Sequence, residues 1–460
     1  MSDDLRSDAR DIVSNIISGV DPFSCVLRAV SREGDRLNVG ADSFDISSYE
    51  NIYLVAFGKA SVAMSKALEE ILGDDLSGGC AVTKYGFGGS LKKVNIMEAG
   101  HPIPDKNGVI AAECIRDLLE KTGSKDLVFF LISGGGSALM TLPRKGISLS
   151  DFISLTNKLM RVGATIDEIN TIRKHLSAVK GGGLAKMAYP SESISLILSD
   201  VVGDPLDVIS SGPTVPDRST FEDFQQIVER YDLKLSPAVE GLVEDGLEGV
   251  VEDTPKSEGP VFEKCHHYLV GNNSLALHEA EKRAKELGYN TLVLTSSLVG
   301  EASEIARVFA AIAREERKES RPLSPPACIL AGGETTVRIK GKGKGGRCQE
   351  MALSFALETR GLENILFVPT ATDGNDGPTD AAGAFADGYS LEKSKNVHID
   401  AKALLRQNNS YEFFREIGDL LITGPTGTNV MDVYILLIGW RIWFRNRSVR
   451  LGYYISISTS

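Results

Sequence analysis

The sequence predicts an α/β fold in which mostly parallel, Rossmann-like sheets are covered by helices. Seven short runs of β-branched and aromatic residues are almost continuously apolar, and helical patterns such as 274–287 and 301–317 lie between several of them. Such runs are typical of strands buried on both faces, and their alternation with helices is typical of parallel sheets. The predicted strands are 51–57, 126–133, 193–199, 266–271, 291–296, 327–333 and 364–370.

Length and composition indicate a globular protein with more than one domain. The chain has 460 residues, of which 42% are hydrophobic and 24% are charged, and its formal net charge is -12. A chain of this length is expected to form two or three domains. The negative charge argues against a nucleic-acid-binding protein, because affinity for the phosphate backbone depends on clustered lysine and arginine.

The cysteines and the N-terminal sequence favour a cytoplasmic protein. Six cysteines are scattered without a C-x-x-C pair, so neither a disulfide framework nor a zinc ribbon is predicted. The first residues, MSDDLRSDARDIV, carry acids and no apolar run, unlike a secretory signal. No stretch approaches the ~20 apolar residues of a membrane span, so we expect no membrane partner.

Two segments have the composition of domain edges. Residues 243–260 are acidic and loop-rich, and residues 314–326 are charged and then proline-rich. We therefore predict a large N-terminal α/β domain over 1–325 and a smaller C-terminal α/β domain over 326–438. Residues 439–460 form an atypical basic and aromatic tail.

Glycine, serine, lysine and acidic residues gather in the loops that follow the predicted strands. Ligands of open parallel sheets bind beyond the carboxyl ends of the strands, so these loops are the candidate site. In FGKAS, Lys59 adds a charge to a helix start that already favours an anion. The alternative is a solvated lysine in the first helical turn.

A run of three glycines follows the second predicted strand in SGGGSALM. Gly134, Gly135 and Gly136 allow close approach of a ligand to the backbone, and Ser137 can cap a helix or contact a phosphate. The run matches neither the dinucleotide fingerprint nor the P-loop. A purely structural tight turn is the alternative.

A capping box opens a helix in TIDEINTIRKHLSAVKGGG, residues 165–183. Its polar face carries Asn170, Arg173, Lys174 and Lys180. This face could contact a ligand, and the alternative is an ordinary charged face in contact with solvent. Lys180, beside a second glycine triplet, and Asn272, directly after the strand 266–271, are further candidate ligand-binding residues.

Two acidic loops are candidates for ligand or metal binding. LSDVVGDPLD contains Asp200, and TDGNDGPTD contains Asp373 and Asp376. Mg²⁺ prefers oxygen ligands, usually one or two carboxylates together with phosphate. The alternative for both loops is a set of Asx turns.

The stretch GGETTVRIKGKGKGGRCQE predicts a strand, a cationic glycine turn and a helix. Lys342 and Lys344, with Gly345 and Gly346, suit a polyphosphate. Arg347 is expected at the helix start, where a phosphoryl group in transfer needs fixed positive charge.

Long motifs over about residues 8–438 resemble the class II glycerate kinases, or glycerate 2-kinases. They include VAFGKAS, SGGGSALM, IRKHLSAVKGGGLA, LSDVVGDPLDVISSGPT, GGETTV, ATDGNDGPTDAAGA and TGPTGTNVMD. The resemblance implies transfer of the γ-phosphate of ATP to the 2-hydroxyl of D-glycerate, with Mg²⁺, in a cleft between two α/β domains. It also implies that Lys59 and Arg347 are catalytic and that Asp200 lies in the same cleft.

The resemblance indicates a kinase that acts on D-glycerate, and a homo-oligomer is compatible with the sequence. Two other functions are the alternatives. An NAD(P)-dependent hydroxypyruvate reductase would need a dinucleotide fingerprint and an acidic ribose ligand, and the chain shows neither. A non-catalytic anion-binding module would leave the acidic loops unexplained.

Overall fold

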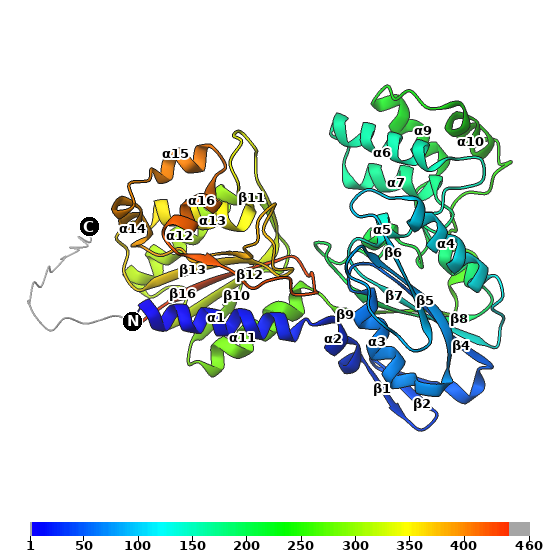
Figure 1. Ribbon diagram of the computed structural model, residues 1–460, viewed down its shortest axis with the longest axis horizontal. Helices are drawn as coiled ribbons and strands as arrows, with labels where there is room; N and C mark the ends of the chain where they lie inside the picture. Colours follow the sequence, from blue (N-terminus) through cyan, green and yellow to red (C-terminus); the bar gives the residue numbers. More distant parts are fainter. Residues whose placement is uncertain (1, 441–460) are drawn as a thin grey trace, which may run out of the picture.

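The computed structural model describes residues 2–440 and has two lobes, each built around one sheet (Figure 1). The α/β class is confirmed. In the first lobe, six strands are all parallel, as the sequence predicts, in the order β6-β5-β4-β7-β8-β9. These strands are β4 (Asn51–Phe57), β5 (Leu76–Lys84), β6 (Val94–Ala99), β7 (Asp126–Ile132), β8 (Glu192–Leu198) and β9 (Cys265–Gly271).

The central strand β7 shows why this lobe has helices on both faces. All seven of its residues are buried, and successive side chains point to opposite faces. Phe129 and Leu131 join the core that contains α3, whereas Val128 and Phe130 join the core that contains α4. The helices on these faces include α3 (Ser61–Leu72), α4 (Lys106–Leu119), α5 (Gly136–Leu139) and α8 (Gly183–Ala188).

The sheet of the second lobe is mixed rather than mostly parallel. Its order is β10-β12-β16-β13-β14-β15, with β11 also paired to β12. The prediction of a mostly parallel sheet is wrong here because β16 lies between β12 and β13 and runs antiparallel to both. The strands are β10 (Asn290–Val293), β11 (Leu298–Glu301), β12 (Ala327–Thr336), β13 (Ile365–Ala371), β14 (Gly383–Ala384), β15 (Leu420–Leu421) and β16 (Asp432–Ile438).

The division between the sheets does not fall near residue 325. Because β10 and β11 pair with β12, the chain enters the second lobe directly after β9, through α11 (Asn273–Glu286). The proline-rich residues 320–326 only connect α12 (Ala302–Glu319) to β12 within that lobe. The predicted boundary therefore mistakes a helix-to-strand loop for a linker.

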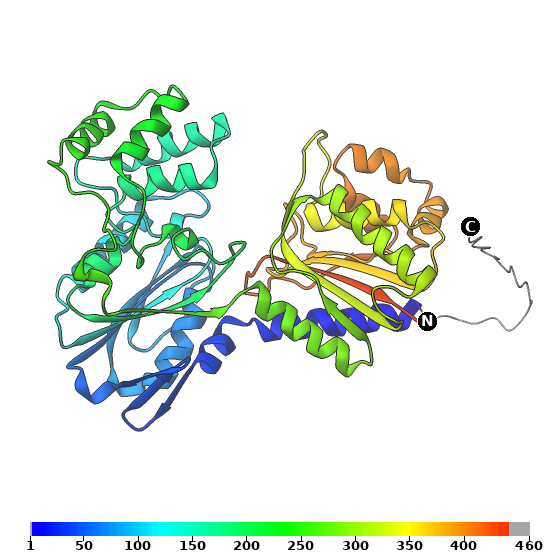
Figure 2. The same cartoon turned by 180° about the vertical axis from the view of Figure 1, so that it is seen from behind.

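The N-terminal helix also belongs with the second lobe. α1 (Ser2–Gly19) runs alongside α11 below the second sheet, as Figures 1 and 2 both show. The hydroxyl of Tyr289 donates a hydrogen bond to Asp8 over 2.6 Å, and Arg283 pairs with Asp11. Over residues 2–440, the chain therefore passes between the lobes twice, between α1 and α2 and between β9 and α11.

A cap of four helices stands above the first sheet (Figure 1). Its own core contains Phe152, Ile172 and Phe224, and Thr165 and Glu168 form the predicted capping box of α7. The cap helices are α6 (Leu149–Val162), α7 (Ile166–Leu176), α9 (Phe221–Arg230) and α10 (Pro237–Leu247).

Smaller elements complete both lobes. In the first they are α2 (Pro22–Ala29), β1 (Val30–Glu33), β2 (Arg36–Val39) and β3 (Asp42–Asp45); in the second they are α13 (Arg347–Glu358), α14 (Ser390–Asn396), α15 (Ala401–Arg406) and α16 (Ser410–Glu416). Within residues 2–440, no helix is long and apolar enough to cross a bilayer. Most of the predicted tail, residues 441–460, lies outside the described residues.

Candidate functional site

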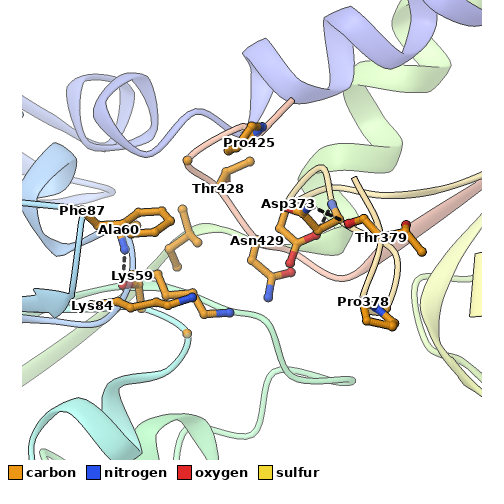
Figure 3. A pocket seen from close by; sticks show the side chains of 16 residues that line it. Lys59, Ala60, Lys84, Phe87, Asp373, Pro378, Thr379, Pro425, Thr428 and Asn429 are labelled. Atoms are coloured by element: carbon orange, nitrogen blue, oxygen red, sulfur yellow. Dashed lines mark hydrogen bonds between the residues drawn. The ribbon is translucent and has the colours of Figure 1, made fainter. Parts of the chain in front are cut away.

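A cavity of about 290 Å³ lies between the two lobes, and we call it the interlobe cavity. Figure 3 shows Lys59 and Lys84 extending from the first lobe toward Asn429 of the second. The second lobe contributes loops that include Asp373 and Thr428. Two cations thus face a polar wall that contains a carboxylate, which suits an anionic ligand that also carries a metal.

Lys59 is positioned by contacts between two strand-to-helix loops. Its own N–H donates to the carbonyl of Gly134 over 2.9 Å, and the N–H of Ala60 donates to Ser133 Oγ over 3.1 Å. Gly58 has a φ of +121°, and a Cβ there would lie 2.2 Å from Ser133 Oγ. Only glycine allows the loop after β4 to rest this closely on the loop after β7.

The glycines after β7 are required by what packs against them. A Cβ on Gly134 would lie 1.9 Å from a carboxylate oxygen of Asp200. Gly135 has a φ of +84° and faces the ring of His101. Gly134 lines the interlobe cavity, so the structural interpretation of these glycines and the functional one are compatible.

Asp200 follows β8 and lies against the inner wall of the interlobe cavity. Burial raises the pKa of its carboxyl to about 6, against the attraction of Lys59, and the nearby charge of Glu334 adds to the rise. Asn429 Nδ2 donates a hydrogen bond to Asp200 Oδ2 over 3.3 Å. A carboxyl that titrates near neutral pH is suited to accept a proton.

A second cavity, of about 540 Å³, opens on the other side of Asp200. We call it the serine cavity, after Ser137, Ser210 and Ser211 in its wall. Ser137 Oγ and Ser211 Oγ are 2.8 Å apart, and Ser211 Oγ donates to Asn170 Oδ1 over 3.1 Å. Its wall also contains Gly135, Asp167, Arg173, Asp200 and Glu334.

Arg347 begins α13, as predicted, but its guanidinium is held by two carboxylates. Nε and Nη2 donate to Asp432 over 2.5 Å and 2.9 Å, and Nη1 donates to Glu334 over 2.6 Å. Glu334 lines the serine cavity, whereas Arg347 is not among the residues that line either cavity. Glu334 therefore lies between Arg347 and the serine cavity.

Lys180 and Asn272 have structural contacts in place of the predicted ligand contacts. The buried Lys180 Nζ donates to the carbonyls of Ser137 and Met140 over 2.7 Å and 3.1 Å, which fixes the turn after the glycine triplet. Asn272 caps α11 and donates to Asp204 over 2.7 Å. Neither residue lines the interlobe cavity or the serine cavity.

The cationic glycine loop rests on the second lobe, outside both cavities. The ammonium of Lys344 lies 4.1 Å from the centre of the Tyr411 ring. Gly345 and Gly346 lie too close to Ser410 and Asp376 for a Cβ to fit. Lys342, like its neighbours in the loop, does not line either cavity.

The two aspartates proposed for metal binding have different surroundings. Asp373 lines the interlobe cavity. Asp376 is buried and accepts hydrogen bonds from the N–H groups of Cys348 (3.1 Å) and Gln349 (2.7 Å) at the start of α13, and burial raises its pKa to about 7. Among residues 2–440, no three His, Cys, Asp or Glu side chains are grouped as a metal site. Of the two, Asp373 lines the interlobe cavity and Asp376 does not.

Three residues of these cavities were not proposed as ligands from the sequence: Lys84, Arg173 and Asn429. Nor was His101, whose ring lies against Gly135. Burial, with the charges of Lys59 and Lys84, lowers the pKa of His101 to about 4, so it is neutral near pH 7. Asn429 lies within the motif TGPTGTNVMD, which was the available signal. Arg173 lies within the motif IRKHLSAVKGGGLA and had the same signal, whereas Lys84 and His101 had none that separates them from surface residues.

Family models match two parts of the chain. Residues 8–244 match a family described as a domain of unknown function (DUF4147), and residues 327–432 match the MOFRL family. A glycerate 2-kinase of Pyrococcus horikoshii is 44% identical over 438 residues, which are 95% of this chain and 98% of the relative. An Agrobacterium vitis relative with a provisional hydroxypyruvate reductase name is 43% identical and covers 84% of this chain and 87% of its own.

A solved structure agrees with the sequence relatives. The crystal structure of a glycerate kinase from Thermotoga maritima is 41% identical and has a TM-score of 0.86, over 95% of this chain and 100% of its own. These matches cover 95% of this chain and therefore include both lobes. The chain belongs to the glycerate kinase family, as its motifs predicted.

Proposed function

We propose that this protein transfers the γ-phosphate of ATP to the 2-hydroxyl of D-glycerate, giving 2-phospho-D-glycerate and ADP. The observation that carries the proposal is the position of Asp200, which lines the serine cavity and also contacts two residues of the interlobe cavity, Gly134 and Asn429. A phosphate donor and a hydroxyl acceptor can then approach the same carboxylate from opposite sides.

The donor phosphates belong in the interlobe cavity, beside Lys59 and Lys84. Phosphoryl transfer depends mainly on positioning and on fixed positive charge around the transferred group. Lys59 is the best placed cation, because the docked loops hold its backbone and its charge acts on Asp200. Gly134, Gly135, Gly136 and Ser137 would contact the bound substrates from the turn between the cavities.

Asp200 is proposed as the base for the acceptor. The 2-hydroxyl oxygen forms a bond to the γ-phosphorus while the bond from that phosphorus to the β,γ-bridging oxygen breaks, and the hydroxyl proton passes to Asp200. A pKa of about 6 leaves the carboxylate ionised near pH 7 and still basic enough to take the proton.

Arg347 is proposed to stabilise the transferred phosphoryl group once the substrates are bound. Three of its five N–H groups are used by Asp432 and Glu334, so two remain. Glu334 lies in the cavity wall between Arg347 and the substrates, so a shift of this side chain would expose the guanidinium. Lys342 and Lys344 of the cationic loop would then add only long-range attraction for ATP.

Mg²⁺ is proposed as the metal, with Asp373 as its protein ligand. Mg²⁺ commonly binds one or two carboxylates together with the phosphates of its nucleotide, and a single aspartate in the interlobe cavity fits that pattern. When bound, the ion would neutralise charge on the phosphates. A cytoplasmic location and a homo-oligomeric state remain expectations from the sequence.

A coupled assay tests the function. The protein is incubated with D-glycerate, ATP and Mg²⁺, ADP release is followed, and ³¹P NMR identifies the product. We expect a 2-phosphate; a 3-phosphate would correct the acceptor position, and no ADP release would overturn the kinase. A parallel reaction with hydroxypyruvate and NADH tests the reductase, and we expect no NADH oxidation.

A further inference from the structure

Arg173 is a half-buried arginine without a counter-charge among the described residues. It lies on α7 in the wall of the serine cavity, and its Nε is buried with no hydrogen-bond partner. Burial lowers its pKa, and no carboxylate offsets that effect. By contrast, Arg6 and Arg347 each pair with two carboxylates. An unpaired buried charge is costly, so a site of this kind calls for an anion.

A second basic side chain and several polar groups lie near Arg173. The buried ammonium of Lys180 is close enough for Arg173 to lower its pKa further, after burial itself. The hydroxyls of Ser137 and Ser211 lie in the same wall and hydrogen-bond to each other. The carboxylates that line the cavity are Asp167, Asp200 and Glu334, and none of them forms an ion pair with Arg173 among the described residues.

We propose that Arg173 binds the carboxylate of the acceptor and thereby selects 2-hydroxy acids. This inference rests on the proposed function and adds the residue that recognises the substrate class. The planar fork of an arginine can hold both oxygens of a carboxylate. The 2-hydroxyl is attached to the carbon next to that carboxylate, so in an acid held at Arg173 this hydroxyl has a fixed position close to the bound carboxylate.

The charges of the cavity agree with this orientation. Asp200 and Glu334 would repel the substrate carboxylate, whereas Arg173 attracts it. The acid therefore has one favourable orientation, with its carboxylate at α7 and its hydroxyl near Asp200. In this position Arg173 sets specificity and takes no part in the transfer of the proton or the phosphoryl group.

The test compares D-glycerate with its neutral amide, D-glyceramide, in wild-type protein and in the variants R173M and R173K. R173M should lower kcat/KM for D-glycerate about 10- to 150-fold, as expected for lost hydrogen bonds to a charged group. The loss should lie mainly in the KM for D-glycerate, with the KM for ATP unchanged. For D-glyceramide, R173M should change kcat/KM less than about threefold. For D-glycerate, the kcat/KM of R173K should lie between the values of the wild type and of R173M.

The control is R161M, which removes an exposed arginine from α6 of the same cap and should change neither acceptor. Thermal unfolding of each variant shows whether it is folded. An equal loss for both acceptors, or an unchanged KM for D-glycerate in a folded R173M or R173K, overturns the inference while the kinase stands. No turnover of D-glycerate by the wild type overturns the proposed function, and this inference with it.

Discussion

The side-chain amide of Asn429 donates a hydrogen bond to the carboxylate of Asp200 over 3.3 Å, and the two residues belong to different lobes. Asp200 follows β8 of the first sheet, and Asn429 precedes β16 of the second. This bond closes the inner wall of the interlobe cavity. The surroundings of the proposed base therefore depend on how closely the lobes approach each other.

The activity should depend on pH through Asp200. Because its pKa is raised to about 6, kcat/KM should rise as pH increases through about 6 and then level off, as the carboxyl loses its proton and becomes a base. A pH profile between 4.5 and 8 at saturating ATP, with intervals of about half a unit, measures this. A midpoint near 4 would show that Asp200 is not the titrating group.

Replacement of Lys59 by alanine should lower kcat/KM at least about tenfold, or roughly 1.4 kcal/mol. It should also move the acid limb of the pH profile to higher pH, because the charge of Lys59 lowers the pKa of Asp200. Lys66→Ala is the control, since Lys66 is exposed on α3, the helix that follows Lys59, and its ammonium lies over the Phe23 ring. Near-normal kinetics in a folded Lys59→Ala protein would remove Lys59 from the mechanism.

Asp200→Asn should stabilise the protein in a pH-dependent way. Burial raises the folded pKa of Asp200 from 3.8 to about 6, so the folded state holds this proton more tightly than the unfolded state. The wild type therefore loses stability as pH rises from about 4 to about 6, whereas the asparagine does not titrate.

Relative to wild type, the unfolding free energy of Asp200→Asn should increase over that range by up to about 3 kcal/mol. The difference in Tm between the two proteins should increase in parallel and then remain constant. The same variant should be nearly inactive. A Tm difference that does not change with pH would contradict the raised pKa.

Arg347→Lys should lower kcat by about 10³ or more if Arg347 acts on the transferred phosphate. Asp432→Asn keeps the arginine and disturbs only its bidentate anchor, so it should reduce stability more than kcat. Kinetics and thermal unfolding of the two variants separate these effects. If Arg347→Lys retains kcat and raises only the KM for ATP, the arginine provides general attraction for the nucleotide.

Asp373 and Asp376 should differ in their response to metal. Asp373→Asn should raise the Mg²⁺ concentration needed for half-maximal activity, because Asp373 faces the interlobe cavity. Asp376→Ala should leave the Mg²⁺ titration unchanged and cost about 0.5 to 2 kcal/mol of stability, since it removes the acceptor for two N–H groups at the start of α13. Identical Mg²⁺ titrations for Asp373→Asn and wild type would return the loop to a structural role.

The strands that were predicted correctly are those that can be recognised from their own residues. The run 51–57 is continuous, apolar and bounded by polar residues, and β4 has these bounds. β5 was missed because LSGGCAVTK contains two glycines, and its position depends on pairing with β4. The boundary near 325 was wrong for a similar reason, because the pairing of β10 with β12 is invisible in the composition of the loop between them.

The candidate site could be predicted only in part. Lys59 and Asp200 follow strand ends directly, and the carboxyl ends of parallel strands meet at one edge of a sheet. The contacts of Lys180 and Asn272 depend instead on which carbonyl or carboxylate the fold brings to them. Arg173 was grouped with a solvated helix face, because its lack of an ion pair among residues 2–440 is a property of the folded cap and not of its neighbours in the chain.

The two passages of the chain between the lobes restrict how the molecule can deform. They lie side by side, since a Cβ on Gly271 of one passage would lie 3.1 Å from Cys25 Sγ beside the other. Two lobes joined by one segment can rotate about several axes. Two lobes joined by two adjacent segments rotate mainly about one hinge axis, the line that passes through both segments. Opening and shutting the interlobe cavity is the motion this arrangement permits, and a cut in either passage alone would leave the halves tethered.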